Sequence, residues 1–184
     1  MQILQPPVSA EYGSVYAPYI ASVPEGAFEP LLQAQIGLLQ RMGAALTSDQ
    51  GRYRPAPDAW SVNEVIGHIC DVERVLLYRA VAVARKDSGP LGSFDQEAYV
   101  REAGYDARPI LDLVAEFAAL RTATLHTFGH AEAAVFDRRR DINGNIMSVR
   151  ALLYVMVGHV YYHYASLTDE YFGAMGLGLA DTPV

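Results

Sequence analysis

The segment Gly158-His159-Val160-Tyr161-Tyr162-His163 lies deep inside the last long apolar part of the chain. If this part is helical, its two histidines stand about 40° apart around the helix and roughly 6 Å apart along it. Two imidazoles so placed can bind one metal ion, because histidine is a common metal ligand. A third histidine, His68, falls in another segment with helical spacing of its apolar residues. We therefore predict that His68, His159 and His163 meet inside a helix bundle and hold a divalent metal ion.

The fold class follows from four long segments in which apolar residues recur every three or four positions. Helices are expected over residues 30–46, 61–85, 110–128 and 148–172. Ser61 with Glu64 three residues later forms a capping box, the clearest helix start in the chain. Long connectors over 87–109 and 130–147 separate the last three helices. This pattern is typical of an all-α four-helix bundle with long crossover connectors.

The remaining parts of the chain carry local signals. Residues 1–24 contain four prolines and three tyrosines, which predict an extended N-terminal arm docked on the body of the same chain in preference to a partner subunit. The bundle is expected over 25–172, and a glycine-rich C-terminal tail over 173–184. Residues 94–100 indicate a short helix, and the pair Asn143-Gly144 indicates a hairpin turn.

Composition excludes several classes of protein. The chain has 184 residues and a formal net charge of −7, which argues against a nucleic-acid partner. Its single cysteine, Cys70, permits no intrachain disulfide and favours a reducing compartment. Residues 1–7 lack the features of a signal peptide, and no apolar run is long enough to span a membrane. We therefore expect a cytoplasmic protein that binds neither membrane nor nucleic acid.

The metal prediction has alternatives that spacing alone leaves open. The three histidines could be unrelated core residues, each hydrogen-bonded to a backbone group or a tyrosine. His126 and His130 also stand four apart, but Gly129 interrupts them and the helix C-terminus explains histidines there. Cys70 lies two residues after His68, a rotation of about 200° around a helix, so we interpret it as a packing residue.

Two motifs carry a resemblance to a known family. They are Trp60-Ser61-x-x-Glu64-Val65-x-x-His68-Ile69-x-Asp71-x-Glu73-Arg74 and, much later, Gly158-His159-x-x-x-His163. Together with Phe94-Asp95-Gln96-x-Ala98-Tyr99, this order of motifs resembles the DinB/YfiT-like metalloprotein superfamily over roughly residues 16–172. The resemblance implies a bundle with an up-down-down-up course. It also implies zinc or nickel on His68, His159 and His163.

The resemblance also implies a function and further site residues. Relatives include thiol S-transferases that use low-molecular-weight thiols such as bacillithiol, and mycothiol-dependent isomerases. We expect a metal-dependent enzyme, either a hydrolase or a thiol S-transferase, whose metal keeps an open coordination position. The alternative is a non-catalytic stress-response or binding module with a structural or vestigial metal.

Four side chains are candidates for catalytic roles. Glu64 and Asp71 flank His68 in the sequence and could orient the imidazoles. Asp95 and Tyr99, in the long connector, could reach the metal as a base or a substrate contact. Other roles explain three of them better, because Glu64 and Asp95 can cap helices and Asp71 can be solvated or paired with a tyrosine.

The expected partners are a small-molecule substrate and a second copy of the chain. Arg138-Arg139-Arg140 could bind an anionic thiol conjugate, although a solvated loop explains a run of like charge better. Tyr161 and Tyr164 could form the face of a homodimer or fill the core.

Overall fold

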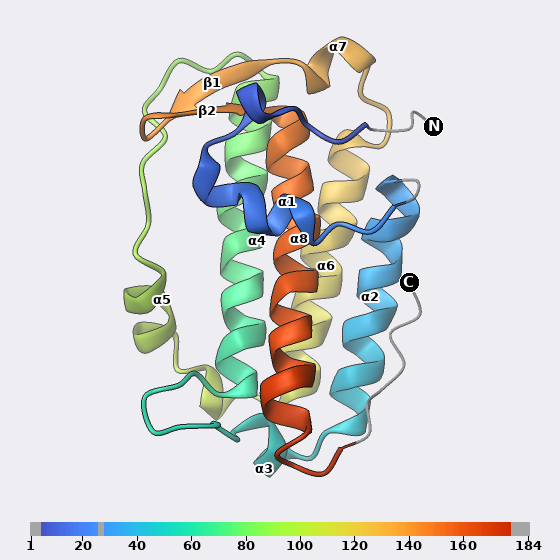
Figure 1. The fold of residues 1–184 in the computed structure, drawn as a ribbon, viewed down its shortest axis with the longest axis vertical. Helices are drawn as coiled ribbons and strands as arrows, with labels where there is room; N and C mark the ends of the chain where they lie inside the picture. The colour runs from blue at the N-terminus through green and yellow to red at the C-terminus, as the bar shows by residue number, and fades with distance from the viewer. Residues whose placement is uncertain (1–4, 26–27, 178–184) are drawn as a thin grey trace.

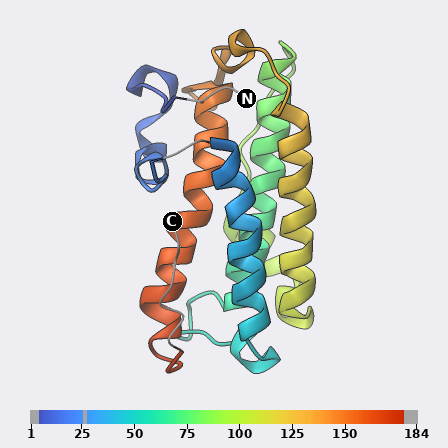
Figure 2. The same ribbon diagram turned by 90° about the vertical axis from the view of Figure 1, so that its right-hand side faces the viewer.

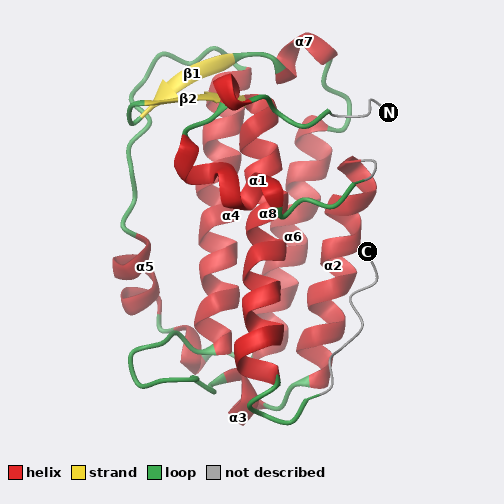
Figure 3. Ribbon diagram, in the orientation of Figure 1, coloured by secondary structure: helices red, strands yellow, loops and turns green. Residues whose placement is uncertain are grey.

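A computed structural model, described over residues 5–25 and 28–177, contains four long helices side by side (Figures 1 and 3). They are α2 (Phe28–Ala45), α4 (Val62–Ala84), α6 (Ile110–Phe128) and α8 (Val149–Ser166), and α8 continues as a π-helical segment, Leu167–Phe172. The expected all-α bundle is therefore confirmed. None of the described helices is both long and apolar enough to cross a bilayer.

The course of the chain explains the long connectors. α4 and α6 run in one direction and α2 and α8 in the other (Figure 1). Residues 85–109 therefore return along the length of the bundle between two parallel helices, and they include α5 (Gln96–Ala103). This is the up-down-down-up course that the family resemblance implied.

Helix ends follow the capping signals in the sequence. The Ser61 hydroxyl accepts from the Glu64 amide at 3.0 Å, and the Glu64 carboxylate accepts from the Ser61 amide at 2.9 Å. Ser148 caps α8 by accepting from the Ala151 amide at 2.9 Å. Both predicted starts are confirmed, because each cap satisfies amides that the first helical turn leaves unpaired.

A small hairpin covers the end of the bundle where α4 and α6 finish (Figure 1). Strands β1 (Arg139–Ile142) and β2 (Asn145–Ser148) pair antiparallel, and the turn residues Asn143 and Gly144 have φ of 53° and 79°. Such left-handed angles suit Asn-Gly, so the predicted turn is confirmed. The short helices α3 (Ser48–Gly51) and α7 (Ala133–Phe136) were not predicted from the sequence.

The expectation that residues 138–140 form a solvated loop is wrong for two of the three arginines. Arg138 donates to the Ala84 carbonyl at the end of α4. Arg140 donates to the Asp87 carbonyl at 2.6 Å and to the Gly89 carbonyl. Only Arg139 is exposed. Carbonyls left free beyond a helix end attract such donors, which fasten the hairpin to the bundle.

The N-terminal arm docks on the same chain, over α8 (Figures 1 and 2). It is not extended throughout, since it contains two single turns of 3-10 helix and α1 (Ala17–Ala21). α1 crosses α8 at Gly158, where a Cβ atom would lie 1.7 Å from the Tyr19 carbonyl oxygen. Only glycine permits this approach. Predictions for residues 1–4 and for 178–184 of the tail lie outside the described residues.

The core has an apolar cluster at each end of the bundle. Between them lie buried polar side chains from all four long helices: Gln35, His68, Glu73, Arg121, Thr124 and His159. Burying polar groups costs free energy unless they are paired. Stability alone therefore does not explain why polar residues occupy this layer of the bundle.

Candidate metal centre

Three histidines converge in the polar layer. His68 comes from α4 and the other two from α8, two helices that pack against each other in opposite directions. The Nε2 atom of His159 lies 3.1 Å from Nε2 of His68 and 3.1 Å from Nε2 of His163. All three offer a ligand atom, and these atoms lie within 4.8 Å of one another. Among the described residues, this is the one group of three or more His, Cys, Asp or Glu side chains that meets this spacing.

The surroundings keep these imidazoles neutral. Burial, assisted by the charge of His163, lowers the pKa of His68 to about 3. Burial lowers the pKa of His163 to about 4. The pKa of His159 falls well below its usual value because of burial, the other two histidines and the Arg121 guanidinium. Neutral imidazoles present free lone pairs, which is the state that binds metal.

Aromatic rings surround the cluster. The Trp60 ring lies 4.7 Å from His68, the Tyr19 ring 5.2 Å from His159, and the Tyr162 ring 5.5 Å from His163. His68 and His159 are 2% and 4% exposed, whereas His163 is partly open to solvent. The cluster is therefore largely shielded from solvent, and His163 is its most exposed member. Sequence reasoning missed Trp60, Tyr19 and Tyr162 as neighbours of the site, although Trp60 opens the first motif and Tyr162 directly precedes His163 in the second.

A buried ion pair lies behind the cluster. Arg121 on α6 pairs with Glu73 on α4 at 3.0 Å, and both side chains are at most 2% exposed. The Thr124 hydroxyl donates to Glu73 at 2.7 Å, and Arg121 donates to the Met156 carbonyl of α8 at 3.3 Å. This network joins three of the long helices at the level of His159. It was not recognised in the sequence, because no local pattern pairs residues 73 and 121.

Three of the four candidate catalytic side chains, the carboxylates, have partners outside the cluster. Glu64 completes its capping box and pairs with Arg54 at 2.5 Å. Asp71 accepts from the Tyr105 hydroxyl at 2.5 Å and from Arg74 at 3.3 Å. Asp95 caps α5 by accepting from an amide at 3.1 Å. In the structure, Glu64 and Asp95 therefore cap helices and Asp71 pairs with a tyrosine, as the alternative roles predicted.

Tyr99 is 47% exposed and lines a groove on the outer side of α4 together with Asp71. None of the three histidines lines that groove. Nδ1 of His68 is buried without a hydrogen-bond partner in the described chain, so neither Glu64 nor Asp71 orients this ring in the structure. Catalytic roles for Glu64, Asp71, Asp95 and Tyr99 stay predictions.

The two alternative ligand candidates lie elsewhere. Cys70 is fully buried, its thiol points to the Leu113 carbonyl at 3.6 Å, and burial raises its pKa. It is a packing residue, as expected. His126 and His130 are exposed at the end of α6 and beyond it.

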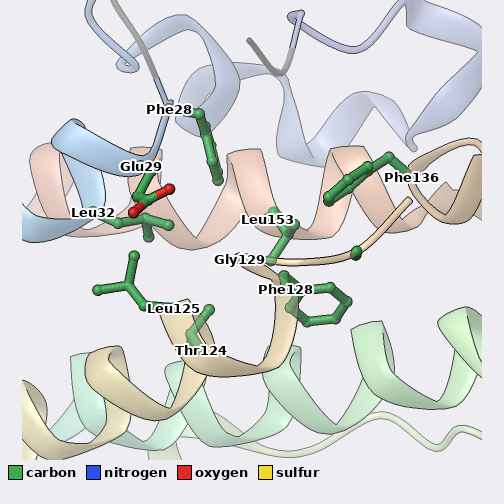
Figure 4. A pocket seen from close by; sticks show the side chains of 10 residues that line it. Phe28, Glu29, Leu32, Thr124, Leu125, Phe128, Gly129, Phe136 and Leu153 are labelled. Atoms are coloured by element: carbon green, nitrogen blue, oxygen red, sulfur yellow. The ribbon is translucent and has the colours of Figure 1, made fainter. Parts of the chain in front are cut away.

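A separate apolar cavity of about 60 Å³ lies between α2, α6 and α8 (Figure 4). Phe28, Phe128 and Phe136 line it, and Glu29 is the one charged side chain in its wall. A cavity of this composition offers a single possible metal ligand. Within the described part of the chain, the metal candidates are therefore confined to the histidine cluster.

The fold and the cluster together define a class, the four-helix bundles with an up-down-down-up course and three histidines facing one another from two antiparallel helices. The family model of the DinB superfamily matches residues 31–167, and the chain belongs to this superfamily. Comparison with curated proteins found no match.

Solved structures share the fold at low sequence identity. YfiT from Bacillus subtilis, described as a probable metal-dependent hydrolase with an unusual four-helix bundle topology, is 16% identical with a TM-score of 0.72. That alignment covers 85% of this chain and 92% of YfiT. The DinB-like protein YjoA from Bacillus subtilis is 17% identical with a TM-score of 0.62, over 85% of this chain and 96% of that one. A mycothiol-dependent maleylpyruvate isomerase is 10% identical with a TM-score of 0.64. That alignment covers 80% of this chain and 62% of the isomerase.

Proposed function

We propose that this protein is a metal-dependent enzyme whose His68, His159 and His163 bind a divalent metal, zinc or nickel, and leave a coordination position open. The observation that carries the proposal is the convergence of three neutral Nε2 atoms. Tetrahedral ligands about 2.0–2.1 Å from zinc lie roughly 3.4 Å apart. The two Nε2 separations of 3.1 Å fit that spacing closely.

The three Nε2 atoms are also better arranged to bind a metal ion than to form hydrogen bonds with one another. An imidazole Nε2 has one lone pair or one proton, so His159 cannot form a full hydrogen bond with both neighbours at once. A cation placed between the rings would accept all three lone pairs. Three histidines without a fourth protein ligand are typical of catalytic sites.

A bound metal would supply acidity to a coordinated water or thiol, so that either could react at neutral pH. The chain itself would hold the three imidazoles, exclude water by burial, and leave the approach past His163 to the substrate. Hydrolysis is supported by the likeness to YfiT, and thiol S-transfer by the likeness to the mycothiol-dependent isomerase. We propose these two reactions as the first to assay, with a low-molecular-weight thiol as the candidate substrate.

Metal content tests the proposal directly. The chain is purified without a histidine tag, saturated with Zn²⁺ or Ni²⁺, desalted and measured by emission spectrometry. We expect about one metal per chain for the wild type and for the control His126→Ala, and less than about 0.2 for His163→Ala. Equal metal content in wild type and His163→Ala would contradict it.

A non-catalytic module with a structural metal is the second candidate, favoured by the engagement of Glu64, Asp71 and Asp95 with other partners. Ester hydrolysis and thiol transfer are assayed on the same metal-loaded protein. Full metal content and higher thermal stability without turnover in either assay would favour this candidate.

A further inference from the structure

Three aromatic side chains, Tyr19, Trp60 and Tyr162, lie against the histidine cluster, and we term them the aromatic rim. Each of the three contacts a different histidine, at centroid distances of 5.2, 4.7 and 5.5 Å respectively. Tyr19 and Tyr162 also contact each other edge-to-face at 5.2 Å. Tyr162 is 45% exposed, so part of this rim is available to a ligand.

The rim joins distant parts of the chain. Tyr19 comes from α1 of the arm, Trp60 from the segment before α4, and Tyr162 from α8. The arm is held against α8 at Gly158, next to His159 in the sequence, by a contact that only glycine permits. α1 lies across the outer side of α8 in both views (Figures 1 and 2). The arm therefore places Tyr19 against His159.

The rim presents apolar aromatic rings, and its two tyrosines add hydroxyl groups. The pKa of Tyr19 is raised by burial and by its neighbours Tyr162 and Tyr16. Aromatic faces and edges favour contact with other rings and with apolar groups, in addition to the gain from the area that is buried. Among the described residues, no carboxylate or cation contributes to the raised pKa of Tyr19.

We propose that the aromatic rim binds the part of the substrate next to the metal and selects a flat, aromatic group there, with Tyr19 and Tyr162 as specificity-determining residues. This inference rests on the proposed function for its catalytic meaning. For thiol transfer, the selected group would belong to the thiol or to its acceptor. For hydrolysis, it would flank the bond that is cleaved.

Histidine ring signals in NMR spectra test the proposal without requiring turnover. The full chain, as purified and again after saturation with Zn²⁺, is titrated with benzyl alcohol and, separately, with 1-butanol. The variants are Tyr162→Leu and Tyr19→Leu, with Tyr78→Leu as the matched control, because Tyr78 is 59% exposed and lines the groove on the outer side of α4. His126 and His130 serve as internal reference signals outside the site.

We expect benzyl alcohol to shift the His159 and His163 signals, to leave His126 and His130 unchanged, and to bind more tightly than 1-butanol. Its affinity should fall about tenfold in Tyr162→Leu and Tyr19→Leu but not in Tyr78→Leu. Equal binding of the two alcohols, no shift at His159 and His163, or unchanged affinity in Tyr162→Leu would each overturn the proposal. Tyr162 is outside the buried core, so its variant stays informative if Tyr19→Leu unfolds. Because the metal-free chain gives the same readout, failure to bind Zn²⁺ would contradict only the proposed function.

Discussion

At the scale of single residues, the polar layer places ionisable groups where water cannot reach them. His68 and His159 are at most 4% exposed, and the neighbouring Glu73–Arg121 pair is at most 2% exposed. Well-packed apolar residues at such positions often stabilise a protein as much as a buried ion pair does, or more. The chemistry of the histidines, with the ion pair packed behind them, therefore explains this layer better than stability does.

Burial of neutral histidines makes the stability of the metal-free protein depend on pH. An unfolded histidine takes up a proton below its usual pKa of 6.5, whereas His163 resists protonation until about pH 4 and His68 until about pH 3. Between pH 6.5 and about pH 4 the unfolded state therefore binds more protons than the folded state. The contribution of these neutral histidines to the free energy of unfolding is fully present above pH 6.5 and is lost as the pH falls through this range. Lowering pH from 7 to 5 should cost about 2 kcal/mol for each such histidine.

Urea unfolding of the metal-free chain at pH 7 and pH 5 measures this dependence. His163→Gln should reduce the loss between the two pH values by one histidine's share, while His126→Gln should leave it unchanged. An equally steep loss in His163→Gln would show that other groups cause the dependence.

Removing one member of the buried ion pair should be far more damaging than removing an exposed one. In Arg121→Met, the Glu73 carboxylate stays buried without its cation, and we expect a loss of about 3–5 kcal/mol in the free energy of unfolding. The control is Arg101→Met, whose partner Glu102 is exposed, with an expected change below about 1 kcal/mol. Urea unfolding at pH 7 compares them, and similar losses in both variants would contradict this expectation.

At the scale of elements, contacts between distant segments build the site, and this limits what sequence can predict. The capping box at Ser61 and the apolar period of the long helices are local, so the helix positions could be predicted. The Asn143-Gly144 turn was predictable for the same reason. The docking of Tyr19 on His159 and the pairing of Glu73 with Arg121 join residues far apart in sequence, and no local pattern encodes either contact.

The contact between α1 and α8 can be tested at Gly158. A Cβ atom there would lie 1.7 Å from the Tyr19 carbonyl oxygen, so Gly158→Ala must displace the backbone of the arm. We expect faster hydrogen exchange over residues 17–21 in the variant, with unchanged protection in α6. The control is Gly92→Ala, since a Cβ atom added at Gly92 would meet no described atom within 4 Å. Unchanged exchange in the arm of Gly158→Ala would contradict the close contact.

At the scale of the whole molecule, the up-down-down-up course brings α4 and α8 side by side in opposite directions. That arrangement lets one histidine from α4 meet a pair from α8, so the fold and the site are linked. Sequence periodicity predicted the bundle and the three histidines, and the family resemblance supplied the course. The homodimer, the cytoplasmic location and the lack of a nucleic-acid partner stay predictions, because they concern partners and a cellular setting that a single chain does not contain.

Metal binding should also stabilise the whole fold, since the cluster forms only when α4 and α8 are packed. A metal at about 100 times its dissociation constant adds about 2.7 kcal/mol to the free energy of unfolding. Thermal unfolding of the wild type with and without Zn²⁺ measures this gain, and His68→Gln should abolish it. A Zn²⁺-induced rise in melting temperature that persists in His68→Gln would place the metal elsewhere.

X-ray absorption spectroscopy of the zinc-loaded protein is the most direct test of the metal centre. We expect three imidazole nitrogens at about 2.0–2.1 Å together with at least one exchangeable oxygen ligand. In His163→Gln, the imidazole contribution should fall or the zinc should be lost. A first coordination sphere containing sulfur, or one dominated by carboxylate oxygen and unchanged in His163→Gln, would contradict the three-histidine centre.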